Sequence, residues 1–366
     1  MKINLFFFIS QFNFGGAGNA IFNFLKNFDK KKYNLNMIFI GHSDYEKLLP
    51  KHVKFYKLTT NTYFFKTFFS FFFIRKILLQ KDLIDKKNIF ISNIHYSNVL
   101  SIIFLRNIQN LKIILFERTS LKELDIFYKF LPFIKNQIVK FLIKYTYPKA
   151  DKVLTNSKTS VKELKDLKIK SGIVYSGSLN KVVKKKKFLK KNFFKIIAVG
   201  RLTYQKDYLT LLDAIKNIKN KNFTLKIYGD GELKDRLIYY IKNNGLKKYV
   251  KLNGHETDTR KIYSNADLLI HSAIFEGLPN TVVEAMNYEI PIIASNSFGG
   301  TKEVLNNGKF GDLFNPGDSI GLRKMIQSFL INPIKLKKKV IKSKSFLKRF
   351  NKKDSCKSFE KILMSI

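Results

Sequence analysis

The chain has 366 residues, and 68 lysines and arginines against 27 acidic residues give a formal net charge of +41. This length suits two domains that each bury a core. The single cysteine excludes a disulfide framework and favours a reducing cytoplasm. The charge attracts polyanions, but no zinc-finger spacing, RNA-binding aromatic motif or isolated basic arm is present, so we expect no specific nucleic-acid partner.

Strand-like and helix-like segments alternate along the chain, which predicts α/β architecture with parallel sheets and crossover helices. The strands expected in the first half are apolar runs at residues 2–9, 35–40, 53–58, 89–94, 112–116 and 152–155. The first run lacks a small-residue cleavage site, so we interpret it as a buried strand and not as a signal peptide.

A glycine-rich turn at residues 15–18 follows the first expected strand and precedes a helix. Such a turn allows a phosphate to approach backbone amides at a helix start. The spacing differs from the three-glycine dinucleotide fingerprint, and no acidic partner follows at the right distance. An ordinary left-handed turn is therefore the alternative.

Two further strands of the first half end in polar residues. His95 follows the strand at 89–94, and Glu117 and Arg118 follow the strand at 112–116. Ligands of open α/β sheets bind at this edge. The alternatives are a structural histidine and a surface ion pair, which contributes little.

Two apolar segments, at 63–74 and 127–147, are too short or too interrupted by lysine to span a membrane, which takes roughly 18 apolar residues or more. The first is rich in phenylalanine, and the second interleaves apolar residues with lysines. Both suit helices that lie on an anionic membrane surface, although a core helix is as good an interpretation of the first.

The charged, non-periodic segment 181–191 is expected to link two domains. The alternation then restarts with a strand at 194–199 that ends at Gly200 and Arg201. Arg201 and Lys206, close to the next helix start, would suit a diphosphate clamp. In so basic a chain, solvated charges are the alternative.

An apolar strand at 267–272 precedes Glu276, and Gly277 and Pro279 then break the chain before a helix. Glu284 lies about one turn into this helix, on the same face as Asn280. Two carboxylates placed here can accept hydrogen bonds from a polyol, while backbone amides hold phosphate. A solvated loop with one surface carboxylate is the alternative.

The block from residue 264 to residue 303 resembles the signature of family 4 retaining glycosyltransferases, in which seven residues separate two glutamates. The order Gly-Arg-Leu, three residues, Lys-Asp that starts at Gly200 resembles that family's diphosphate-binding motif. The resemblance is strong in the second half and weak in the first. It implies the GT-B fold, in which two Rossmann-like parallel-sheet domains face a central cleft.

On this resemblance, residues 1–180 form an acceptor-side domain, 181–191 a basic linker and 192–345 a nucleotide-sugar-binding domain. Residues 346–366 form a helix that packs back on the first domain. The glycine turn resembles the family's loop that faces the donor phosphates, but the glutamate that often follows it is absent here, where Ala17-Gly18-Asn19 stands.

The resemblance also implies roles for individual residues. Glu276 would bind the transferred sugar and Glu284 the ribose, while Arg201 and Lys206 hold the diphosphate. The catalytic residues implied are His95, Arg201, Lys206 and Glu276. The donor-binding residues implied are Gly16, Gly200, Arg201, Lys206, His255, Glu276, Gly277, Leu278, Asn280, Thr281 and Glu284. Glu117 and Arg118 would line the acceptor side.

The implied activity is retaining transfer of a hexose or N-acetylhexosamine from a nucleotide-sugar, with UDP expected, to a glycan or polyprenyl-linked acceptor in cell-surface glycan or glycoprotein-glycan assembly. No metal or other cofactor is expected, because no Asp-x-Asp motif is present and cationic side chains replace the ion. We expect a cytoplasmic protein on the inner face of the membrane. A non-catalytic polyanion- or membrane-binding protein of this fold, and a nucleotide-sugar hydrolase or epimerase, are the alternatives.

Overall fold

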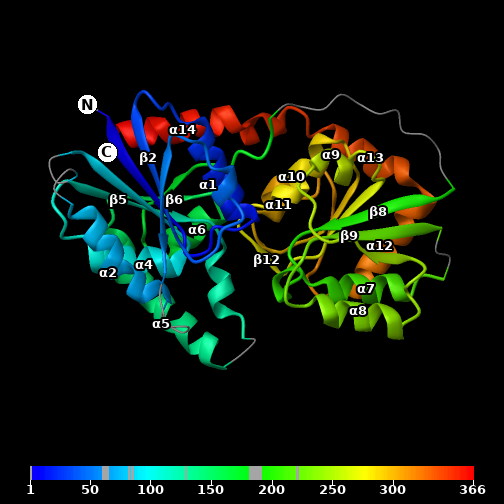
Figure 1. The fold of residues 1–366 in the computed structure, drawn as a ribbon. Coiled ribbons are helices and arrows are strands. Elements are labelled where there is room, and N and C mark those ends of the chain that lie inside the picture. Colours follow the sequence, from blue (N-terminus) through cyan, green and yellow to red (C-terminus); the bar gives the residue numbers. More distant parts are fainter. Residues whose placement is uncertain are drawn as a thin grey trace. The chain divides into compact units, whose positions relative to one another are not determined.

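The computed structural model describes residues 2–59, 66–80, 83, 86–127, 130–180, 192–219 and 222–366. The chain forms two compact units, one of Met1–Gly177 with Lys352–Ile366 and one of Ser178–Asn351 (Figure 1). The expected linker at 181–191 lies outside the described residues. None of the described helices combines the length and the apolar composition that crossing a membrane requires.

The first unit is built on a parallel sheet with the strand order β3-β2-β1-β4-β5-β6-β7. Its strands are β1 (Ile3–Phe8), β2 (Tyr33–Ile40), β3 (Val53–Leu58), β4 (Asn88–Asn93), β5 (Leu111–Glu117), β6 (Lys152–Thr155) and β7 (Gly172–Ile173). All six predicted strands of the first half are thereby confirmed to within two residues. Their continuous apolar runs reflect burial on both faces, as parallel sheets require.

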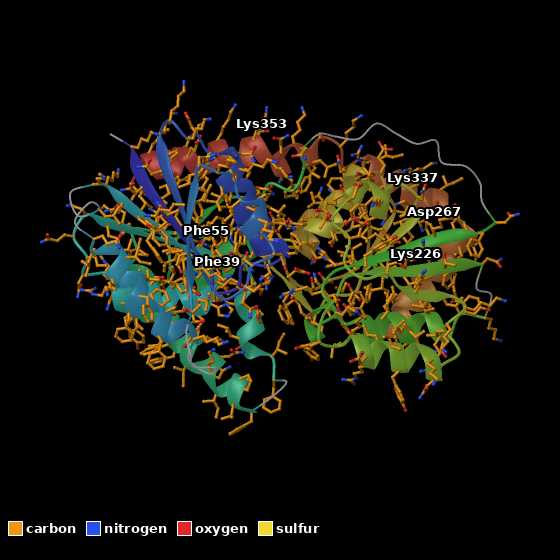
Figure 2. All side chains as sticks on the ribbon, in the orientation of Figure 1. Phe39, Phe55, Lys226, Asp267, Lys337 and Lys353 are labelled. Atoms are coloured by element: carbon orange, nitrogen blue, oxygen red, sulfur yellow. The ribbon has the colours of Figure 1, made fainter. Side chains whose placement is uncertain are left out.

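Helices cover both faces of this sheet (Figure 1). One face packs against α2 (Lys66–Leu78), α4 (His95–Leu105), α5 (Phe130–Thr146) and α6 (Lys158–Asp166). The other packs against α1 (Gly16–Asn27) and α14 (Lys352–Met364). At the sheet's edge, Phe39 of β2 stacks on Phe55 of β3 with 6.2 Å between ring centroids (Figure 2).

The helix predicted over residues 346–366 is two separate pieces. A 3₁₀ helix, Phe346–Phe350, belongs to the second unit and α14 to the first. Between them Asn351 is extended, with ψ of 136°, and pairs with Leu179. The helix is interrupted because the chain crosses here from one unit to the other. Within the first unit, Phe359 of α14 packs edge-to-face on Phe24 of α1, with centroids 5.0 Å apart.

The second unit is built on a parallel sheet with the strand order β10-β9-β8-β11-β13-β15. Its strands are β8 (Phe194–Val199), β9 (Phe223–Tyr228), β10 (Val250–Leu252), β11 (Leu268–His271), β13 (Ile292–Ser295) and β15 (Asp312–Phe314). A separate parallel pair joins β12 (Phe275–Glu276) to β14 (Phe298–Gly299). The helices are α7 (Tyr208–Lys216), α8 (Lys234–Asn243), α9 (Thr259–Tyr263), α10 (Asn280–Asn287), α11 (Thr301–Val304), α12 (Ser319–Ile331) and α13 (Pro333–Ile341).

Both sheets reverse their strand order at one place. In the first, β1 lies between β2 and β4, and in the second, β8 lies between β9 and β11. Such a reversal leaves a crevice at the carboxyl ends of the strands, where open α/β sheets bind ligands. The predicted α/β class with two Rossmann-like units is confirmed, and the polar residues predicted at strand ends lie at these two edges.

Candidate functional site

A nearly buried ion pair between Lys206 and Glu276 lies at the carboxyl ends of the strands in the second unit's sheet. The Lys206 Nζ donates a hydrogen bond to the Glu276 Oε1, and the two side chains are 13% and 10% exposed. The His271 Nε2 lies 3.5 Å from the same carboxylate oxygen. Burial, and then the positive charge of Lys206, hold the pKa of His271 well below its usual value, so this histidine is neutral.

Hydrogen bonds join the loops that carry these residues. Gln205 accepts a backbone hydrogen bond from Ile274 at 2.8 Å, and its side-chain amide donates to the Phe275 carbonyl at 2.9 Å. The Ser272 hydroxyl donates to the Lys206 carbonyl at 2.7 Å. Because β8 pairs directly with β11, the loops that follow them start side by side, and these bonds fix Lys206 against Glu276.

Arg201 lies on the same side of the unit and is exposed. Its Nη2 donates to the Gln205 Oε1 at 3.3 Å, so Gln205 links Arg201 to the Glu276 segment. Gly200, next to it, has φ of 153°, and a Cβ there would lie only 2.9 Å from the Lys206 Cε. A Cβ on Gly229, in the loop after β9, would lie 1.9 Å from the Gly200 carbonyl oxygen. Glycine at both positions is what lets these loops and Lys206 pack closely.

The α10 helix start contributes polar groups whose bonding capacity is unused. The Asn280 Oδ1 and the Thr281 Oγ1 are buried and have no partner among the described residues. One turn on, Glu284 accepts a hydrogen bond from the Tyr263 hydroxyl at 2.8 Å. Gly277 accepts a backbone bond from Gly300, which holds the loop before the helix. Unpartnered buried acceptors are rare, so this helix start is a strong candidate for contact with a ligand.

The remaining donor-side residues lie close by in the chain or in neighbouring loops. Leu278 is buried beside Gly277. His255 follows β10, and its neighbour Gly254 accepts a backbone hydrogen bond from Gly229 at 2.8 Å, so its loop lies beside the loop after β9.

In the first unit, His95 is the first residue of α4 and faces a fully buried Glu117. The His95 Nδ1 lies 3.7 Å from the Glu117 Oε1, while the Oε2 accepts from the Tyr147 hydroxyl at 2.7 Å. Burial opposes the charged form of His95, but the charge of Glu117 outweighs it, so the pKa of His95 is raised. His95 and Glu117 therefore form one buried polar cluster at the carboxyl edge of the sheet.

The surface ion pair considered for Glu117 and Arg118 is wrong, because both residues are buried. The Arg118 guanidinium instead lies 3.7 Å over the Phe116 ring, and its Nε donates to the Asn93 Oδ1 at 2.6 Å. Burial lowers the pKa of Arg118 to about 9, and its Nη1 and Nη2 have no partner among the described residues. Burying a charge without full pairing costs free energy. Such a buried, incompletely paired charge is typical of a functional site.

Gly16 is the first residue of α1, so its backbone amide lies at the amino end of a helix. A Cβ on Gly18 would lie 2.2 Å from the Asn13 carbonyl oxygen, which explains the third glycine of the turn. Asn19 accepts a hydrogen bond from the buried Tyr45 hydroxyl. Asn19 belongs to the segment 17–19, where the family often has a glutamate, and its bond to Tyr45 holds the glycine turn in place.

Sequence reasoning missed His271, Gln205, Tyr263 and Tyr147. His271 ends an apolar run and was assigned to a buried strand, although the rule that singled out His95, a polar residue at a strand end, applies to it as well. Gln205 lay inside the three-residue gap of the recognised motif. Nothing local marks the two tyrosines, since each reaches its carboxylate across the fold.

Comparison with known proteins places this geometry in context. Residues 180–345 match the family model described as glycosyl transferases group 1. A Campylobacter jejuni GalNAc-alpha-(1->4)-GalNAc-alpha-(1->3)-diNAcBac-PP-undecaprenol alpha-1,4-N-acetyl-D-galactosaminyltransferase is 27% identical over 98% of this chain and 95% of its own length. An Escherichia coli UDP-Gal:alpha-D-GlcNAc-diphosphoundecaprenol alpha-1,3-galactosyltransferase is 31% identical over 52% of this chain and 51% of its own.

Two solved structures share the fold over the whole chain. Anabaena HepE in complex with UDP-glucose has a TM-score of 0.81 at 18% identity, with 100% of both chains covered. Sucrose-phosphate synthase from Thermosynechococcus elongatus has a TM-score of 0.82 at 15% identity, covering 100% of this chain and 99% of its own.

Proposed function

We propose that this chain, a glycosyltransferase of the GT-B fold whose residues 180–345 match the glycosyl transferases group 1, moves a hexose or N-acetylhexosamine from UDP to a lipid-linked glycan. We further propose that the transfer retains the configuration of the sugar. The observation that carries the proposal is the nearly buried pair of Lys206 and Glu276, with neutral His271 beside it, at the carboxyl edge of the second sheet. The Campylobacter and Escherichia coli relatives support a diphospho-undecaprenol-linked acceptor. HepE, solved with UDP-glucose, and the Escherichia coli enzyme's UDP-galactose support a UDP donor.

Donor binding changes the partners of Lys206. In the structure its ammonium is neutralised by Glu276, and a bound diphosphate offers a second, doubly charged partner. Glu276 then accepts hydrogen bonds from hydroxyls of the transferred sugar, and Arg201, which is exposed, folds onto the phosphate oxygens. The Asn280 and Thr281 side-chain oxygens, which have no hydrogen-bond partner among the described residues, accept hydrogen bonds from the donor. Glu284 binds the ribose.

The reaction breaks the bond between the sugar C1 and the diphosphate oxygen and forms one between C1 and the acceptor oxygen. Negative charge grows on the leaving diphosphate as the sugar approaches an oxocarbenium ion, so preorganised positive charge is the main contribution of the protein. The acceptor hydroxyl gives its proton to the departing phosphate oxygen on the same face of the sugar. No protein nucleophile is required, and Arg201 with Lys206 takes the place of a divalent ion.

The first unit provides the acceptor side in this proposal. His95, whose pKa is raised by Glu117 against the effect of burial, has the role of donor-sugar contact that the family resemblance implies. Glu117 and Arg118 form the buried base of the cluster. Closure of the site excludes water, which separates transfer from hydrolysis.

An anionic membrane surface is the partner proposed for the first unit. Three helices of one face, α2, α4 and α5, carry no aspartate or glutamate. They are neighbours, since Phe72 of α2 packs on Phe104 of α4 at 5.0 Å and Lys135 of α5 lies 4.0 Å from the Tyr96 ring of α4. Large apolar side chains on them are at least 40% exposed: Phe69, Phe72, Phe73, Ile103, Phe130, Leu131, Ile134, Ile138, Phe141 and Tyr145.

This α2–α4–α5 surface combines apolar side chains with cations. Arg75 and Lys76 end α2, and Lys140 and Lys144 lie along α5. An apolar patch rimmed by basic residues binds anionic lipid through both burial and charge. Such a surface would hold the enzyme on the inner face of the membrane, where a lipid-linked acceptor resides.

Incubation with a panel of UDP- and GDP-sugars, with and without a diphospho-polyprenol-linked glycan, tests the proposal. We expect UDP release only when the acceptor is present, and NMR of the product should show the donor's anomeric configuration. Equal release without acceptor would favour a hydrolase, and no release with any donor would favour a binding protein. Either outcome would overturn the transfer proposal.

A further inference from the structure

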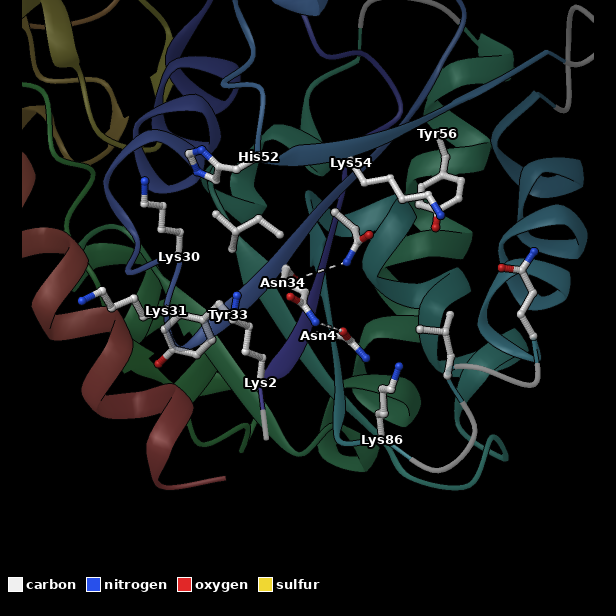
Figure 3. A pocket seen from close by; sticks show the side chains of 14 residues that line it. Lys2, Asn4, Lys30, Lys31, Tyr33, Asn34, His52, Lys54, Tyr56 and Lys86 are labelled. Carbon is white, nitrogen blue, oxygen red and sulfur yellow. Dashed lines mark hydrogen bonds between the residues drawn. The ribbon is translucent and has the colours of Figure 1, made fainter.

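A pocket of the first unit is lined by none of the residues discussed above. It has a volume of about 540 Å³ and opens at the amino ends of β1, β2 and β3 in the first unit (Figure 3). Asn4 and Asn34 sit at the starts of β1 and β2, whereas Glu117 ends β5 and His95 follows β4. Because all strands of this sheet are parallel, the pocket lies at the edge opposite the acceptor cluster.

The lining of this pocket is strongly basic. The described residues that line it include no carboxylate, and its basic members are Lys2, Lys30, Lys31, Lys54, Lys86 and His52. In the described part of the chain, no carboxylate pairs with the ammonium of Lys2, Lys30, Lys31 or Lys86. Elsewhere in the same unit, by contrast, lysines do pair, as Lys112 does with Asp151 at 3.1 Å.

Two acids outside the lining, Asp29 and Glu360, are bonded to the turn that carries Lys30 and Lys31. The Asp29 Oδ1 accepts from the Lys31 backbone amide at 2.8 Å, and Glu360 accepts from the Asp29 amide at 3.3 Å. Both acids raise the pKa of Tyr33, after the larger effect of its burial. Like charges gathered around one hollow repel each other, and a bound anion removes that repulsion.

The floor of the pocket is polar and fixed. The Asn34 side-chain amide donates to the Asn4 Oδ1 at 2.9 Å (Figure 3). The Asn4 amide donates to the Asn88 Oδ1, also at 2.9 Å. The Asn88 amide in turn donates to the Leu83 and Lys86 carbonyls at 2.7 and 2.9 Å. This chain of bonds orients each amide in one direction, so the floor is held in place without a ligand.

Two aromatic rings also line this pocket. Tyr33 and Tyr56 line it, and the Lys54 Nζ lies 5.0 Å from the Tyr56 ring centroid. A volume of this size matches the roughly 300–1,000 Å³ of small-molecule sites. Ammonium groups, amides and rings together suit phosphate groups attached to a compact organic body.

We propose that this pocket binds a soluble anion that carries two or more phosphate groups, at a site separate from the transferase centre. The site requires neither the proposed donor nor the proposed acceptor. Its occupancy and the transfer reaction are therefore tested independently.

Isothermal titration of the full chain with inorganic tripolyphosphate, at 150 mM salt and with saturating UDP, tests the proposal. The variant is Lys31→Gln with Lys54→Gln and Lys86→Gln. The matched control removes the same charge from exposed lysines before and on β10 of the second unit, at Lys247, Lys248 and Lys251.

We expect one tripolyphosphate site in the wild type and at least roughly tenfold weaker binding in the pocket variant, since each unit charge within about 4 Å contributes about 1 kcal/mol even in water. The control variant should keep wild-type affinity, and both variants should keep the wild-type rate of sugar transfer. Equal loss in both variants would show attraction by net charge alone, and no binding by the wild type would likewise overturn the site. If the pocket variant lost binding to phosphatidylglycerol vesicles and kept binding to tripolyphosphate, the soluble anion would be the wrong ligand.

Discussion

The pair of Lys206 and Glu276 gives the sharpest test of the donor site. Glu276→Gln keeps the shape of the side chain and removes the negative charge that neutralises Lys206 in the structure. The ammonium is then left with the diphosphate as its strongest partner. Affinity for UDP should therefore stay the same or rise, while transfer falls because the sugar has lost its carboxylate contact.

The size of the loss follows from the contact removed. Deleting one preorganised contact to transition-state charge typically costs about 2.7–4 kcal/mol, or roughly 10²–10³ in rate. We expect Glu276→Gln to lower kcat/KM at least about a hundredfold. Lys206→Ala should lower it similarly and also weaken UDP binding, since it leaves Glu276 facing the diphosphate unpaired.

A second Lys–Glu pair of the same unit serves as the control. Lys337 and Glu289 lie 3.8 Å apart and are 13% and 11% exposed, against 13% and 10% for the site pair. Glu289→Gln should lower Tm by a similar amount and leave kcat/KM within about twofold of the wild type. The assays are acceptor-dependent UDP release, titration with UDP and thermal unfolding. Wild-type kcat/KM in both site variants, or UDP binding weakened equally by both, would show that the pair is only structural.

Three further predictions follow from the proposed function. Transfer should persist in excess EDTA because Arg201 helps to supply the positive charge, and a loss restored by Mg²⁺ would contradict this. The raised pKa of His95 means that its contribution to stability is full below about pH 6.5 and is lost as pH rises through the folded-state value. The Tm difference between the wild type and His95→Gln should therefore shrink above that pH, and a difference that grows would refute the pairing with Glu117. Phe141→Ser should weaken binding to phosphatidylglycerol vesicles roughly tenfold, as burial of one aromatic side chain predicts. The control Ile331→Ser, at an exposed site of the second unit, should leave this binding unchanged. Equal losses in both variants would show that the α2–α4–α5 surface is not the docking face.

The strands could be predicted from sequence because parallel strands buried on both faces read as uninterrupted apolar runs. The runs at 53–58 and 152–155 matched β3 and β6 at both ends. The alternation of apolar residues and lysines at 127–147 likewise indicated the helix observed as α5. These signals are local, and each depends only on the residues of the element itself.

What could not be predicted depends on residues distant in the chain. Glu117 looked like half of a surface pair because its hydrogen-bond partner, Tyr147, lies 30 residues further on. His271 looked like part of a strand core because only the pairing of β8 with β11 places it beside Lys206. The break at Asn351 is invisible to helical periodicity, since it arises where the chain passes between units.

His95 and His271 both lie at strand ends and face a carboxylate, at 3.7 and 3.5 Å, yet their pKa values shift in opposite directions. Burial lowers the pKa of both histidines and is the larger cause for His271. The opposite directions then follow from the other partners of the two carboxylates. Glu117 is bonded to neutral groups, so its charge is available to favour protonated His95. The charge of Glu276 is neutralised by Lys206, which also repels a proton on His271.

Replacing Lys206 should therefore alter His271 as well. Lys206→Ala removes one of the two causes that hold the pKa of His271 down, burial being the larger, and exposes His271 to the uncompensated charge of Glu276. As pH falls, His271 gains a proton and replaces part of the missing positive charge beside the diphosphate. The kcat/KM of Lys206→Ala, taken as a fraction of the wild-type value, should be higher at about pH 6 than at about pH 8, on either side of the ordinary histidine pKa. The double variant with His271→Gln should lack this recovery, and a recovery that persists in it would show that another group carries the proton.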